Sequence, residues 1–410
     1  MDQPLRALYV DFNSYFASVE QQLQPTLRGR PVGVLPVLAE TTCCIAASYE
    51  AKAFGVKTGT PVYEARKLCP GIVFVKARPP LYVEMHHKLV AAVESCTPVG
   101  QVLSIDEMTC PLMGSERRSE KALALAYHIK ATIAAQVGAH LRCSIGIAPN
   151  TFLAKIASNM HKPDGCTVLE AVDLPQALYR LELSDIHGIG RALESRLREH
   201  GVATVRQLCA ANAAVLRAAW GSIEGERMHA KLRGEELPGR ETRRASVSHS
   251  HVLPPDLRND AAAYSVLHRL LQKAAMRLRS YALIAGNVHV RVKYRDDSVW
   301  RAGQPVDPTA DTQAFLRALD ALWPRRQKSK APLAVGVALT ALDAATHQSR
   351  SLFDDGHSQE AHDRLNAVID AINLRYGKNS LYFGGAHQAL AAAPMRIAFQ
   401  HIPDLEVEAD

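Results

Sequence analysis

Acidic residues inside otherwise apolar strand segments constrain the fold of this chain more than any other feature. Residues 6–11 form a predicted strand that ends in Asp11, and residues 102–110 form another that carries Asp106 and Glu107. A buried carboxylate is costly unless it is paired or bound to a cation. Neighbours on a regular strand face opposite ways, so Asp106 and Glu107 can serve one site only if the strand bends or ends there. The alternative is that they are strand-end carboxylates with ordinary partners.

Strand and helix segments alternate from the N-terminus to Gly165, which predicts an α/β body. Asn13 or Ser14 is expected to cap the first helix, and Asn150 is expected to cap the helix 150–160. The further predicted strands are 32–38, 44–48, 73–76 and 142–147, and the predicted helices are 14–22, 49–54, 82–96, 119–137 and 150–160.

Beyond Gly165 the pattern changes twice. Residues 173–237 are predicted to be helical with breaks at 187–190 and at Gly201, and residues 238–245 form a polar tether. Strands and two helices follow between 246 and 342, which predicts a small α+β domain, and a last helix is expected over 358–376.

Several segments could bind phosphate groups. A strand that leads directly into a helix at residues 13–16 presents free backbone N–H groups and the positive end of the helix dipole. Tyr49 and Lys52, three residues apart at the start of a helix, could add a hydroxyl and a cation, and Lys162 another cation. Taken singly, each lysine is better explained as an ordinary surface charge.

Gly188 and Gly190 lie in an apolar-x-Gly-apolar-Gly turn that is predicted to connect two helices. Such a turn can direct its backbone N–H groups at a nucleic-acid phosphate without contacting bases. A plain helical hairpin is the alternative.

The positive charge of the chain is concentrated in one segment. The net charge is +7, and residues 240–301 contain twelve Lys or Arg against five Asp or Glu, among them Arg243, Arg244, Arg291 and Lys293. A local basic module on a neutral body favours a phosphate backbone as partner, although a solvated basic surface would give the same count.

The eight cysteines form no C-x-x-C pair, which is typical of a reducing cytoplasm, and no apolar run reaches the ~20 residues that span a membrane.

Four stretches together resemble the Y-family DNA polymerases, in the branch that contains bacterial DNA polymerase IV and UmuC. The most specific is Cys-Ser-Ile-Gly-Ile-Ala-Pro-Asn-Thr-Phe-Leu-Ala-Lys-Ile-Ala-Ser-Asn-Met-His-Lys-Pro-Asp-Gly at 143–165, and the others are 11–20, 47–55 and 104–107. The resemblance extends over residues 5–345 and implies a right-hand polymerase with an additional C-terminal domain, a multidomain α/β plus α+β protein. The implied domains are palm (1–30 and 75–165), fingers (31–74), thumb with a helix-hairpin-helix (166–237), linker (238–245), little finger (246–345) and tail (346–410).

The resemblance also implies a low-fidelity, template-directed polymerase that acts in translesion synthesis on primer-template DNA with deoxynucleoside triphosphates. Asp11, Asp106 and Glu107 would hold two Mg²⁺ ions, which Mn²⁺ can replace, with help from the Phe12 carbonyl. Phe16 would be the steric gate against a ribose 2′-hydroxyl. Many relatives carry Asp at position 13 and Arg at position 52. The residues implied in nucleotide binding are Asn13, Ser14, Tyr15, Phe16, Tyr49, Lys52 and Lys162.

A short peptide after the little finger is similar to the sliding-clamp motif of bacterial polymerases. It consists of Gln348 and the pair Leu352-Phe353. The alternative is that the pair packs back onto the little finger or under the helix 358–376. A monomeric enzyme is expected. Two rival functions are a catalytically inactive relative that binds DNA and recruits partners, which should lack the three carboxylates, and a nucleotidyl cyclase, which would not need the basic domain.

Overall fold

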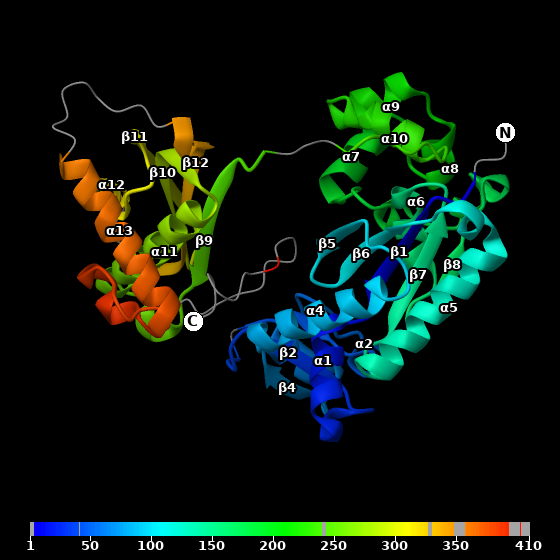
Figure 1. Ribbon diagram of the computed structural model, residues 1–410, viewed down its shortest axis with the longest axis horizontal. Coiled ribbons are helices and arrows are strands. Elements are labelled where there is room, and N and C mark those ends of the chain that lie inside the picture. The colour runs from blue at the N-terminus through cyan, green and yellow to red at the C-terminus, as the bar shows by residue number, and fades with distance from the viewer. Residues whose placement is uncertain are drawn as a thin grey trace. The chain divides into compact units, whose positions relative to one another are not determined.

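The computed structural model describes residues 4–40, 42–239, 243–326, 330–347, 357–392 and 402. The chain divides into two compact units, and the division falls between Arg240 and Glu241, inside the predicted tether. Figure 1 shows the elements of both units, and each unit is described by itself.

A five-stranded sheet forms the centre of the first unit. β1 is its middle strand and pairs antiparallel with both β6 and β7. Every residue of β1 and β7 is buried, as expected of strands that are covered on both faces. The strand order is β5 (Gln101–Ser104), β6 (Glu107–Pro111), β1 (Ala7–Phe12), β7 (Cys143–Ala148) and β8 (Cys166–Val168).

Helix α6 (Thr151–Met160) packs directly on β1 and β7, whereas α5 (Ser119–Gln136) packs on β7 and β8 and against α4 (Pro79–Glu94) (Figure 1). Gly146 makes the close approach of α6 possible, since a Cβ there would lie 2.0 Å from the carbonyl oxygen of Ala154. Ala7 and Tyr9 of β1 share one hydrophobic core with α6. Side chains alternate along a strand, so Asp11 points to the same face.

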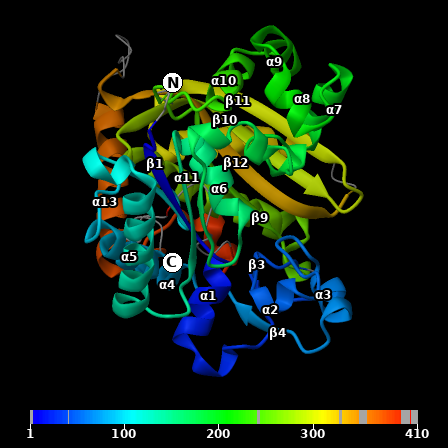
Figure 2. The ribbon, with the colours of Figure 1, turned by 90° about the vertical axis from the view of Figure 1, so that its right-hand side faces the viewer.

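A smaller three-stranded sheet has the order β3 (Ala46–Ala47), β2 (Val32–Leu35), β4 (Val73–Lys76). It lies next to α2 (Tyr49–Lys52) and α3 (Val62–Leu68) (Figure 2). Leu35, Ala47, Ala51, Val62 and Ala65 form part of its core. Helix α1 (Tyr15–Leu23) leads from the large sheet towards this small one, and it contacts both β2 and β3.

The segment after β8 is less helical than predicted. Residues 171–187 contain only the short 3-10 turns Ala171–Asp173, Gln176–Leu178 and Leu183–Asp185. Four α-helices follow: α7 (Arg191–Glu199), α8 (Val205–Ala210), α9 (Ala213–Trp220) and α10 (Glu224–Lys231). Leu193, Leu197, Leu208 and Leu216 join the core that contains α6.

The prediction of one strand over 102–110 was wrong. The chain turns back after Ser104, and β5 and β6 form a tight antiparallel hairpin in which Ser104 pairs with Glu107. The side chain of Ser104 stabilises the turn, because its Oγ donates a hydrogen bond to Asp106 Oδ1 at 2.6 Å.

The second unit contains a four-stranded sheet with two helices on one face. The alternation in β10 is clear: Val288, Val290 and Val292 are buried, whereas His289 and Arg291 are exposed on the opposite side. The elements are β9 (Ser246–Val252), α11 (Asp260–Ser280), β10 (Leu283–Tyr294), β11 (Val299–Thr309), α12 (Thr312–Leu322) and β12 (Pro332–Ala344), in the sheet order β11-β10-β12-β9.

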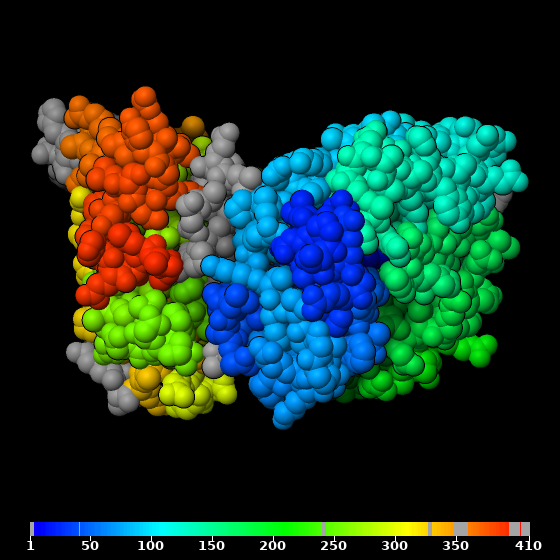
Figure 3. Space-filling model, turned by 90° about the horizontal axis from the view of Figure 1, so that it is seen from below, coloured from blue at the N-terminus to red at the C-terminus, as the bar shows by residue number. Residues whose placement is uncertain are grey.

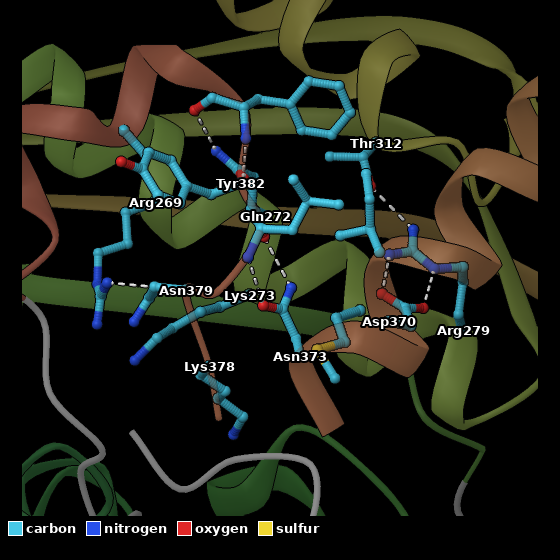
Figure 4. A pocket seen from close by; sticks show the side chains of 15 residues that line it. Arg269, Gln272, Lys273, Arg279, Thr312, Asp370, Asn373, Lys378, Asn379 and Tyr382 are labelled. Atoms are coloured by element: carbon cyan, nitrogen blue, oxygen red, sulfur yellow. Dashed lines mark hydrogen bonds and ion pairs between the residues drawn. The ribbon is translucent and has the colours of Figure 1, made fainter. Parts of the chain in front are cut away.

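Helix α13 (His357–Tyr376) and the segment up to residue 392 belong to this unit and form one continuous surface patch on it, orange to red in Figure 3. Polar contacts attach them to α11 around a pocket of about 50 Å³ (Figure 4). Arg279 forms a two-pronged ion pair with Asp370 at 2.6 and 2.8 Å, and both amide atoms of Gln272 bond to the backbone of Phe383.

Candidate active site

Three carboxylates meet at one end of the large sheet. Asp11 is the penultimate residue of β1, and Glu107 is its direct partner at the start of β6. Asp106 lies in the β5–β6 turn, and its carbonyl oxygen accepts a hydrogen bond from the backbone N–H of Phe12 at 2.9 Å. The hairpin therefore supplies the strand end that Asp106 and Glu107 need to reach one site.

Lys155 is a functional residue that the sequence analysis missed. Its Nζ donates hydrogen bonds to Asp11 Oδ2 at 2.6 Å and to Glu107 Oε1, and the side chain is buried. Burial lowers the pKa of Lys155, but the charges and hydrogen bonds of Asp11 and Glu107 outweigh it and leave the pKa above its usual value. The sequence feature that could have indicated Lys155 is its position within the apolar run Phe-Leu-Ala-Lys-Ile-Ala of α6.

Other groups complete the surroundings of these carboxylates. Lys162 lies 2.6 Å from the second oxygen of Asp11, and the hydroxyl of Tyr9 donates to Glu107 Oε2 at 2.8 Å. Asp106 has no ammonium partner at ion-pair distance among the described residues. Burial, opposed by the Ser104 hydrogen bond and assisted by the charges of Glu107 and Asp11, raises the pKa of Asp106 to about 6.

The donor set suits a hard divalent cation. All three candidate ligands present carboxylate oxygens, the ligands that Mg²⁺ prefers. In the described part of the chain, no three His, Cys, Asp or Glu side chains form a ready metal-binding group, and Lys155 lies between Asp11 and Glu107 instead. Asp106 lies beside Asp11 and Glu107 without an ammonium partner of its own in the described part of the chain, so the donor set fits a bound cation.

The turn between β1 and α1 differs from a simple side-chain cap. Ser14 occupies the position before α1 with a left-handed backbone (φ 48°, ψ 44°), and neither it nor Asn13 caps the helix through its side chain. The Ser14 hydroxyl is buried and has no hydrogen-bond partner among the residues described. A non-glycine residue in this conformation is strained by roughly 1 kcal/mol or more, and such strain is concentrated at functional sites. The side chain of Asn13 bonds to Ser144 and to the backbone of Asp164.

Tyr49, Lys52 and Lys162 gather around Asp11, as the phosphate-site prediction requires. Burial and the charge of Asp11 raise the pKa of Tyr49 to about 12. Burial and the nearby Lys162 lower the pKa of Lys52, against the opposing effect of Asp11. The ammonium of Lys52 lies 4.4 Å from the centre of the Tyr49 ring.

Tyr15 and Phe16, the first two residues of α1, both contact Tyr82. The Tyr15 hydroxyl donates to the carbonyl oxygen of Tyr82 at 2.6 Å and is buried, so it faces the interior. The ring of Phe16 stacks on Tyr82 with centroids 4.7 Å apart and an interplanar angle of 19°. Tyr82 in turn donates to Glu20 at 2.7 Å, and Arg78 pairs with that buried carboxylate.

The prediction that the turn with Gly188 and Gly190 connects two helices was correct only for the helix that follows it. Gly190 precedes α7, but the element before Gly188 is a 3-10 turn rather than a helix. A Cβ at either glycine would meet no atom within 4 Å, so the backbone of both residues is open to a partner. Burial and the charge of Lys155 lower the pKa of the adjacent His187, which places this turn close to the carboxylates.

In the second unit, Arg291 and Lys293 lie on the face of β10 opposite the valine side chains. Arg243 and Arg244 are exposed, and the guanidinium of Arg244 lies 3.9 Å from the centre of the Tyr281 ring. Gln348, Leu352 and Phe353 lie outside the described residues. No helix in the described ranges is long and apolar enough to cross a membrane.

Comparisons with known proteins show which proteins this chain resembles over most of its length. Residues 10–159 match the impB/mucB/samB family, and residues 244–352 match the C-terminal domain of that family. The chain is 31% identical over 392 residues to DNA polymerase IV of Bacillus anthracis, with 92% of each chain covered. It is 33% identical over 386 residues to DNA polymerase IV of Moorella thermoacetica, with 92% of this chain and 94% of the relative covered.

Solved structures extend the likeness to three dimensions. A chimeric Y-family DNA polymerase superposes with a TM-score of 0.71 at 25% identity, covering 83% of this chain and 99% of the chimera. An insertion ternary complex of Dbh DNA polymerase superposes with a TM-score of 0.55 at 25% identity and the same coverage.

Proposed function

Because this chain belongs to the impB/mucB/samB family and is a Y-family DNA polymerase that acts in translesion synthesis, we propose that it extends primers by a two-metal mechanism at Asp11, Asp106 and Glu107. The observation that carries this proposal is the meeting of the three carboxylates at the β1 end and the β5–β6 turn. Two bound divalent cations would lower the pKa of the primer 3′-hydroxyl and neutralise the leaving pyrophosphate.

The residues around the carboxylates have distinct tasks in this proposal. Asp11 and Glu107 are held by Lys155 and Tyr9, which fixes their positions before any substrate arrives. Asp106 has no ammonium group at ion-pair distance among the described residues, so a bound cation would neutralise its charge.

The incoming triphosphate is bound by Tyr49, Lys52 and Lys162 in this proposal. Each lysine adds a positive charge beside the site, and burial together with the charge of Lys162 lowers the pKa of Lys52. An arriving triphosphate relieves that repulsion, so Lys162 can exchange its contact with Asp11 for a phosphate oxygen. Phe16 serves as the steric gate, held in place by its stack on Tyr82.

The domain assignment follows from the same premise. We assign the large sheet with α4 and α5 to the palm, the small sheet with α2 and α3 to the fingers, and α7–α10 to the thumb. The sheet of the second unit with α11 and α12, within residues 246–345, is the little finger. The sheet face that carries Arg291 and Lys293 binds the DNA backbone through charge. Gln348, Leu352 and Phe353 dock on the sliding clamp.

A primer-extension assay with Mg²⁺ on undamaged and lesion-bearing templates tests the proposal. Asp106→Ala should reduce nucleotide addition by at least about 100-fold and leave DNA affinity within a few-fold, because only the cation site is altered. Glu94→Ala, at an exposed position of α4, is the matched control and should extend normally. Extension by Asp106→Ala at more than a few per cent of the normal rate would refute the assignment.

A further inference from the structure

We propose that Asn13 is a positioning residue that holds the loop carrying Lys162 in place for the incoming nucleotide, and that it makes no contact with the nucleotide itself. The proposal rests on the role of Lys162 in triphosphate binding. It differs from the implication of the family resemblance, which placed Asn13 among the nucleotide ligands.

The side chain of Asn13 is almost fully buried, with 3% of its surface exposed. Its Oδ1 accepts a hydrogen bond from the backbone N–H of Asp164 at 2.7 Å, and its Nδ2 donates to Ser144 Oγ at 3.0 Å. Both ends of the amide are therefore engaged inside the protein. One of them bonds two residues beyond Lys162.

Ser144 extends the same network to both ends of the loop. Its Oγ lies 3.3 Å from the backbone N–H of Gly165 and 3.3 Å from the carbonyl oxygen of His161. Oγ accepts from Asn13 Nδ2 and from Gly165, and its single proton is shared between the His161 carbonyl oxygen and Asn13 Oδ1, each at 3.3 Å. The residues on either side of Lys162–Asp164 are thus fixed by a single buried hydroxyl that Asn13 orients.

The opposite side of the loop is held by α5. Lys130 Nζ donates to Asp164 Oδ1 at 2.8 Å and to the Asp164 carbonyl oxygen at 2.5 Å. Asp164 has a left-handed backbone (φ 56°), and a Cβ at Gly165 would lie 1.9 Å from the His161 carbonyl oxygen. The loop is therefore a tight turn that needs external bonds to keep its shape.

The position of Asn13 in the chain gives these contacts a functional consequence. It lies between Asp11, which Lys162 contacts at 2.6 Å, and the strained Ser14 at the start of α1. Asn13 therefore joins the β1–α1 turn to the Lys162 loop, the two sides of the phosphate site. Without its amide, the Lys162 ammonium would sample more positions and bind a triphosphate less tightly.

A double-mutant cycle with Asn13→Ala and Lys162→Ala tests the proposal. Single-turnover incorporation gives the nucleotide dissociation constant and the maximal rate separately. We expect Asn13→Ala to weaken nucleotide affinity about tenfold with little change in the maximal rate. Because Asn13 acts through Lys162, the double variant should be no weaker than Lys162→Ala alone. Additive losses of affinity, or a loss confined to the maximal rate, would overturn the proposal.

Two further measurements keep the outcomes distinct. If Lys162→Ala binds nucleotide normally, the proposed role of Lys162 fails and the inference with it; if it binds weakly but the cycle is additive, only the inference fails. Ser144→Ala removes the shared hydroxyl without replacing a residue of the β1–α1 turn, so it is used in place of Asn13→Ala if that variant does not fold. It should show the same non-additivity with Lys162→Ala, and additivity there would equally reject the idea.

Discussion

Replacing Asp106 with asparagine should make the metal-free protein more stable while it removes polymerase activity. The pKa of Asp106 rises from 3.8 to about 6, chiefly through burial. A carboxyl whose pKa is raised in the folded state stabilises that state only while it is protonated. Its ionisation therefore destabilises the fold progressively as the pH rises from about 4 to above 6.

The size of the effect follows from the same shift. About two pKa units at about 1.36 kcal/mol each set an upper limit near 3 kcal/mol above pH 7. Because Asp106 is only partly shielded from solvent, we expect about 1–3 kcal/mol. For a unit of this size each kcal/mol corresponds to about 2–4 °C in melting temperature. The side chain of asparagine retains an oxygen that can accept the hydrogen bond from Ser104 Oγ, so we expect the β5–β6 turn to be preserved.

Thermal unfolding in EDTA at several pH values measures the prediction. The variant should melt higher than the unmodified protein at pH 7.5, and the difference should vanish near pH 4, where both forms of the side chain are neutral. Glu107→Gln is the matched control: it leaves the buried Lys155 with one carboxylate partner fewer and should lower the melting temperature. A lower melting temperature for Asp106→Asn at pH 7.5 would refute the electrostatic reasoning.

Three further predictions concern nucleotide, DNA and clamp binding. Phe16→Ala should incorporate ribonucleotides at least about tenfold more readily in single-turnover assays, because its ring is the proposed steric gate; unchanged sugar discrimination would contradict this. Replacing Arg291 and Lys293 with alanine should reduce the slope of log affinity against log salt by about 0.9 for each DNA phosphate that the protein no longer neutralises, and an unchanged slope would place the DNA surface elsewhere. Replacing Leu352 and Phe353 with alanine should abolish stimulation by a loaded clamp and spare distributive synthesis; a lower melting temperature with stimulation retained would show that the pair packs within the protein.

Much of the fold was predictable because the local patterns were strong. The bounds of β4 agree with the prediction, α13 begins one residue earlier than predicted, and Asn150 caps α6 by accepting a hydrogen bond from the Leu153 N–H at 2.8 Å. The hairpin at Ser104 was not predictable from turn residues, since neither glycine nor proline marks it. A serine–aspartate contact holds it instead, and that contact depends on the fold.

The candidate site was predictable where a motif carried it and not where tertiary contacts did. Asp11, Tyr49 and Lys52 come together as the resemblance implies, although they lie on separate elements. Lys155 gave only a weak signal, because the sequence does not show that the apolar face of α6 lies over the carboxylates. The inward hydrogen bonds of the Asn13 amide were not predictable either, since its place in a motif does not show which way its side chain points.

The charges of the site explain how three carboxylates can lie close together. Asp11, Asp106 and Glu107 face Lys155 and Lys162, and the two ammonium groups contact only Asp11 and Glu107. Without the lysines, three close carboxylates would repel one another and open the β5–β6 turn. With them, Asp106 is the carboxylate that has no ammonium group at ion-pair distance in the described part of the chain, and burial raises its pKa. The lysines therefore hold the carboxylates together, and Asp106 supplies the unmet charge that favours binding of a divalent cation.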